Sequence, residues 1–115
     1  MMTDILQVWH DFIRAHGISL ESIGLQSRAL TREESLTAID FLQQVGIPIL
    51  GGDVYYVEHG AIQPAYANWH VDRGEHESDQ DFASRSWQFA RQYLRDFPLG
   101  RDLDRKVYVD IVPAL

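Results

Sequence analysis

Residues that could carry out chemistry are concentrated between positions 51 and 76. Asp53, His70, Asp72 and His76 could together hold zinc or a harder metal, because imidazole and carboxylate oxygen are the usual ligands of such ions. Their spacing matches no HExxH motif, no His-x-His pair and no calcium loop. A small metal-assisted hydrolase that uses these four residues is therefore an alternative hypothesis, and we predict no metal site.

Other catalytic arrangements have less support. The chain contains no cysteine, which excludes a thiol nucleophile and a disulfide framework. No serine lies in a G-x-S-x-G elbow. Gly51-Gly52 precedes an expected strand and does not open a helix, so it lacks the geometry of a phosphate cradle. A tight turn in which Asp53 caps backbone amides is the preferred interpretation. We predict no catalytic residues and no cofactor.

Recognition fits the same segment better. Residues 51–70 contain three tyrosines and one tryptophan, which bury a large area in binding surfaces at low conformational cost. Strand alternation places Tyr55 and Tyr56 on opposite faces, and we expect Tyr56 to point away from the helices. Trp69 is equally compatible with the core. The predicted partner-binding residues are Asp53, Tyr56, Trp69, His70, Asp72, Glu75 and Glu77.

The net charge of −7 limits the possible partners. A negative field repels phosphate backbones, which argues against nucleic acid and favours a basic protein. The same charge is also explained by solubility alone. A homodimer, formed through an exposed hairpin edge or through a second apolar side of the helix that contains Phe41, is left open.

Length and segment composition predict one domain over residues 1–115. The first residues, MMTDILQVWHDF, have no basic region followed by a long apolar run, so we expect no signal peptide. No stretch approaches the roughly 18 apolar residues of a membrane span. We therefore expect a cytoplasmic protein that does not bind a membrane.

Three helices are predicted from apolar periodicity and capping residues. The first runs from about Asp4 to His16 with Thr3 as N-cap. The second begins at the capping box formed by Thr31 and Glu34 and stops at Gly46. The third extends from Ser78, as N-cap, to about Phe97.

Strands are predicted around a hairpin at His59-Gly60, where Glu58 faces Ala61 and Val57 faces Ile62. Pro64 favours an edge position for the second hairpin strand. Residues 18–25 are expected to form a connector. The predicted extended segments are 47–50, 54–58, 61–66, 68–71 and 106–112. The expected fold is α+β, with about three helices packed on a small, mostly antiparallel sheet of three or four strands.

The segments GIPILGGDVY (46–55) and NWH (68–70) are similar to the bacterial immunity protein 40 family, and the resemblance extends over residues 29–95. The family consists of small cytosolic antidotes encoded beside polymorphic toxins. The resemblance implies tight binding to a cognate toxin domain and brings no catalytic residues. An antidote that inhibits a basic toxin domain through an acidic and aromatic surface is thus the main prediction. A generic adaptor without a toxin partner is a further alternative.

Overall fold

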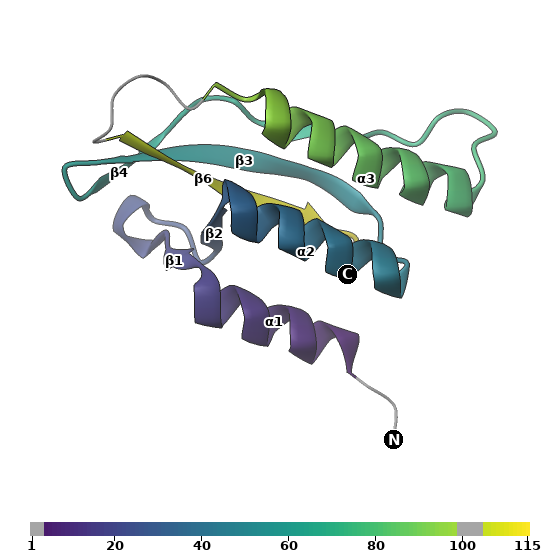
Figure 1. The fold of residues 1–115 in the computed structure, drawn as a ribbon, viewed down its shortest axis with the longest axis horizontal. Coiled ribbons are helices and arrows are strands. Elements are labelled where there is room, and N and C mark those ends of the chain that lie inside the picture. The colour runs from purple at the N-terminus through teal and green to yellow at the C-terminus, as the bar shows by residue number, and fades with distance from the viewer. Residues whose placement is uncertain (1–3, 99–104) are drawn as a thin grey trace.

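The computed structural model describes residues 4–98 and 105–115, in which three helices pack against one antiparallel sheet (Figure 1). The elements in chain order are α1 (Ile5–His16), β1 (Ile18–Ser19), the 3-10 turn η1 (Glu21–Ile23), β2 (Arg28–Thr31), α2 (Arg32–Val45), β3 (Ile49–Glu58), β4 (Ala61–Pro64), β5 (Trp69–His70), α3 (Asp79–Asp96) and β6 (Arg105–Pro113).

The sheet is larger than the three or four strands expected. Its six strands follow the order β1-β2-β6-β3-β4, and β5 pairs with β3 beside β4. The prediction was wrong because β1, β2 and β5 are two to four residues long and show no clear alternation. The pairing of β3 with β6 joins segments about half a chain apart and forms the centre of the fold.

The helix boundaries follow from capping. The capping box of α2 is confirmed: Thr31 and Glu34 exchange hydrogen bonds of 3.1 and 3.0 Å, and Gly46 ends the helix at φ 77°. Ser78 caps α3 as predicted. The N-cap of α1 is Asp4, whose carboxylate accepts from the Gln7 amide. Thr3, the predicted cap, lies outside the described residues.

The hairpin of β3 and β4 has the predicted register, with Glu58 opposite Ala61 and Val57 opposite Ile62. His59 and Gly60 both have positive φ, 51° and 78°, as a two-residue hairpin loop requires. β4 lies at the sheet edge, in agreement with the proline at its end.

Gly51 and Gly52 do not form the predicted turn; they continue β3 where β5 pairs with it. A Cβ atom on Gly51 would lie 2.3 Å from the Trp69 carbonyl oxygen. A Cβ atom on Gly52 would lie 2.8 Å from the indole of Trp69. The two glycines are needed for close approach of β5 and its tryptophan, which a sequence pattern does not distinguish from a turn.

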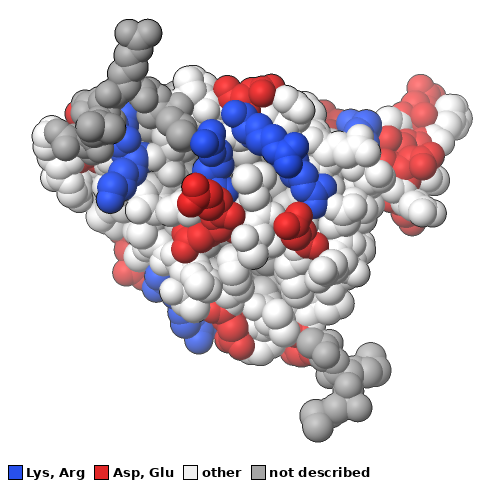
Figure 2. Space-filling model, viewed as in Figure 1, with Lys and Arg blue, Asp and Glu red and all other residues white. Residues whose placement is uncertain are grey.

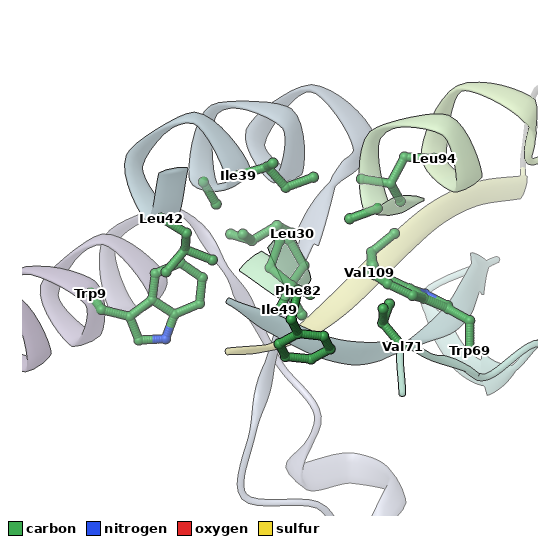
Figure 3. Close-up of a cluster of buried hydrophobic side chains, with 13 residues drawn as sticks. Trp9, Leu30, Ile39, Leu42, Ile49, Trp69, Val71, Phe82, Leu94 and Val109 are labelled. Atoms are coloured by element: carbon green, nitrogen blue, oxygen red, sulfur yellow. The ribbon is translucent and has the colours of Figure 1, made fainter. Parts of the chain in front are cut away.

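The core lies between the sheet and α2 and α3, while α1 packs beside β2 (Figure 3). Strand alternation sends Val109 into this core and places its partner Val54, which is buried, on the same face. The opposite face of the sheet carries a smaller cluster in which Leu20, just before η1, covers Ala29 and Tyr55. Among the described residues, one face of the sheet is thus covered by α2 and α3, whereas the opposite face is covered in part by the segment before β2 and is bordered by α1 beside Asp110.

Candidate functional site

The exposed part of the predicted partner surface begins at β5. His70 and Asp72 point into solvent, with 78% and 83% of their side chains exposed, and His70 Nε2 lies 3.4 Å from Asp72 Oδ2. Glu75 is 91% exposed. At the tip of the molecule beside the start of α3, acidic side chains gather (Figure 2). These side chains are therefore accessible at the surface.

Glu77 has a different role from its acidic neighbours. Arg85 donates two hydrogen bonds of 2.8 Å to its carboxylate, and the Gly74 amide donates a third of 2.8 Å. These contacts, the Arg85 hydrogen bond first, lower the pKa of Glu77 to about 2. Arg73 of the same loop pairs with Asp79, the first residue of α3, at 2.6 Å. Glu77 thus fixes the shape of the loop that presents Asp72 and Glu75.

Two of the predicted aromatic residues lie toward α3. Trp69 is 7% exposed, and its ring centroid lies 5.2 Å from that of Tyr93. Tyr56 lies 6.4 Å from Phe97, and Arg105 covers its ring at 4.3 Å. The prediction that Tyr56 points away from the helices was wrong, because α3 packs on the face of the hairpin that carries Tyr56. Tyr55 is the tyrosine on the other face.

Asp53 belongs to the sheet and not to a turn. It lies on the face without helices, directly opposite Asp110 of β6. Burial raises the pKa of the Asp110 carboxyl, the negative charge of Asp53 adds to this rise, and a hydrogen bond from Ser27 opposes it. Asp110 is a candidate site residue that the sequence analysis missed. The sequence shows the alternation of residues in β6, but it does not show that β3 is the strand that pairs with β6.

Two hollows flank this pair of carboxylates. One, of about 240 Å³, is lined by Asp53, Tyr55 and Asn68 and has Tyr66 at its wall. Tyr66 is 91% exposed. The other, of about 340 Å³, lies between α1 and β6. Its lining residues are Trp9, His10, Ile13, Arg14, Gln26, Ser27, Arg28, Asp110 and Ile111.

The four residues of the alternative metal site are not assembled into one. Within residues 4–98 and 105–115, no group of three or more His, Cys, Asp or Glu side chains is placed to hold a metal ion. His76 lies beside Glu75, at 3.7 Å, while His70 lies beside Asp72. In the same ranges, none of the helices is long and apolar enough to span a bilayer.

Comparison with known proteins decides the family. The sequence model of one family, Immunity protein 40, matches residues 19–113. The chain belongs to the immunity protein 40 family. No curated protein and no solved structure gives a significant match.

The immunity protein 40 match reaches further than the resemblance over residues 29–95. It includes every strand of the sheet except the first residue of β1, and it leaves out α1. Asp53, His70, Asp72 and Asp110 all fall within it. The candidate surface is therefore built on the part of the chain that defines the family.

Proposed function

We propose that this protein is the antidote of a polymorphic toxin system and that it binds and inhibits one cognate bacterial toxin domain. The observation that carries the proposal is the immunity protein 40 match over residues 19–113. The protein acts by occupying the active site of the toxin, or the surface beside it, and itself performs no catalysis. It acts in the cytoplasm, where the toxin would otherwise be active.

The contact surface in this proposal is acidic and includes the sheet face without helices. Asp53 lies on that sheet face. His70, Asp72 and Glu75 extend into solvent. The proposed contact residues are therefore Asp53, His70, Asp72 and Glu75. The charge of −7 supports a basic toxin, since complementary charge speeds association.

Three of the originally predicted contact residues take supporting roles in this proposal. Trp69 anchors β5 against α3, and Tyr56 packs beside the end of α3. Glu77 holds the acidic loop through Arg85. Loss of Trp69 or Glu77 should change binding indirectly, by moving Asp72 and Glu75.

The test is co-expression with the C-terminal domain of the toxin-like protein encoded beside this chain. We expect rescue of growth and a one-to-one complex on co-purification. The double variant Asp72→Asn/Glu75→Gln should weaken the complex and reduce its salt dependence. Glu33→Gln, an exposed acid in the first turn of α2, is the matched control and should bind as the wild type does.

Each outcome has one meaning. Absence of both rescue and complex would refute the antidote function. A complex whose affinity is insensitive to salt and to the double variant would retain the antidote but refute binding through the acidic loop.

A further inference from the structure

We propose that Asp53 and Asp110 form a receptor for a single basic side chain, a lysine or arginine, of the cognate toxin domain. The proposal rests on the antidote function and names the chemistry of its main contact. It also moves the centre of the interface from the acidic loop to the sheet face without helices.

The first argument is that the two carboxylates lie opposite each other and that no cation of the described residues is paired with them. Asp53 and Asp110 are directly paired across β3 and β6, so strand alternation sends both side chains to the same face. Like charges at directly opposed positions destabilise a sheet. Within residues 4–98 and 105–115, neither carboxylate forms an ion pair. A cation from outside would relieve this repulsion.

The second argument is an almost fully buried tyrosine beside the pair. Tyr55 is 6% exposed and lines the hollow next to Asp53. Burial raises the pKa of Tyr55, and the charges of Asp53 and then Asp110 raise it further, which places its phenol within their field. No hydrogen bond of this hydroxyl to another described residue is seen. A guanidinium or ammonium group seated on the carboxylates would supply N–H donors for the phenol oxygen.

The third argument is that the site is accessible and has its own wall. The hollow beside Asp53 opens next to Tyr66, whose exposed ring offers a face on which a cation can stack. On the other side, the hollow of about 340 Å³ reaches Asp110. A long basic side chain can therefore approach the pair without displacing a packed element.

The charged neighbours of Asp110 do not already fill the role of that cation. His10 and Arg14 of α1 and Arg28 of β2 line the same hollow, but among the ion pairs of the described residues none joins them to the Asp110 carboxylate. Arg28 instead donates to the carbonyl oxygen of Gly17 at 3.0 Å. Asp53 is the other carboxylate that faces Asp110, and it adds to the negative charge.

The experiment measures binding of the toxin domain encoded beside this chain to four versions of the full protein. These are the wild type, Asp53→Asn, Asp110→Asn and the control Glu33→Gln. We expect each asparagine variant to raise the dissociation constant at least tenfold, while the dissociation constant of the control stays within twofold of the wild-type value. The thermal midpoint of each free protein is recorded in parallel, because a merely structural pair would lose stability along with affinity.

The outcomes separate this inference from the proposed function. The receptor is supported if the wild type binds and both variants lose at least tenfold in affinity without a fall in their thermal midpoints. Wild-type binding that both variants retain overturns the receptor but leaves the antidote function intact. No binding by the wild type overturns both, and this result is distinguished by the absence of growth rescue.

Discussion

Asp110→Asn should stabilise the free protein at neutral pH, although it removes a native side chain. The variant abolishes the repulsion between residues 53 and 110 while it retains the shape of the side chain and an oxygen acceptor for Ser27. Two unit charges 4 Å apart repel by about 4 kcal/mol at an effective dielectric of about 20. Both carboxylates are only half-buried, however, so water screens the pair, and measured cross-strand effects are about 0.2–1 kcal/mol. We expect a gain of about 0.5–1 kcal/mol.

The pH dependence of this gain has a definite sign. The pKa of Asp110 is raised in the folded protein above the ordinary value of 3.8, so the folded state binds the proton more tightly than the unfolded state. Wild-type stability therefore falls as pH rises from 3.8 through the raised pKa, and the penalty is complete above it. The advantage of the variant should be present at pH 7 and vanish below pH 3.8.

The assay is urea unfolding, and in parallel thermal unfolding, of wild type and Asp110→Asn at pH 7 and pH 3. At about 4 °C per kcal/mol for a domain of this size, the midpoint should rise by about 2–4 °C at pH 7. A lower midpoint at pH 7, or an equal difference at both pH values, would refute the reasoning that the carboxylates repel.

Three further predictions concern the scaffold of the surface. Ser86→Ala should destabilise the fold by about 1–3 kcal/mol in urea unfolding, because the buried hydroxyl accepts from the first amide of β3 at 3.0 Å; an unchanged midpoint would show that this amide finds another partner. Glu77→Gln should lower the thermal midpoint at pH 7, since the depressed pKa contributes stability above pH 4.5 that is lost as pH falls toward about 2; a deficit that persists at pH 2 would contradict the ion pair with Arg85. Gly52→Ala should cost about 1–3 kcal/mol and shift the emission of the Trp69 indole, which lies 2.8 Å from the added methyl group; wild-type stability would show that β5 can retreat freely.

The local elements of this fold were predictable because their causes are local. The Thr31–Glu34 box, the glycine after α2 and the positive-φ pair His59-Gly60 each act within four residues. Such contacts leave a pattern in the sequence that physical rules interpret directly. The starts of α2 and α3 and the hairpin register were confirmed for that reason.

The assembly of the sheet was less accessible, because its causes are distant in the chain. Nothing near Asp53 indicates that its neighbour in space is Asp110. The close approach of Trp69 to Gly52 is likewise invisible until β5 is placed. The wrong tyrosine was predicted to point away from the helices for the same reason. Strand alternation places Tyr55 and Tyr56 on opposite faces, but it does not indicate which face the helices cover.

The pairing of β3 with β6 also sets the order in which the fold can form. Residues 49–58 are synthesised before their partner strand, residues 105–113. Contacts between such remote segments form slowly, because a long loop must close before they stabilise anything. The two carboxylates that face one another cannot meet until that final strand docks. A chain that stops before β6 therefore lacks the opposed pair of Asp53 and Asp110, and with it the receptor proposed above.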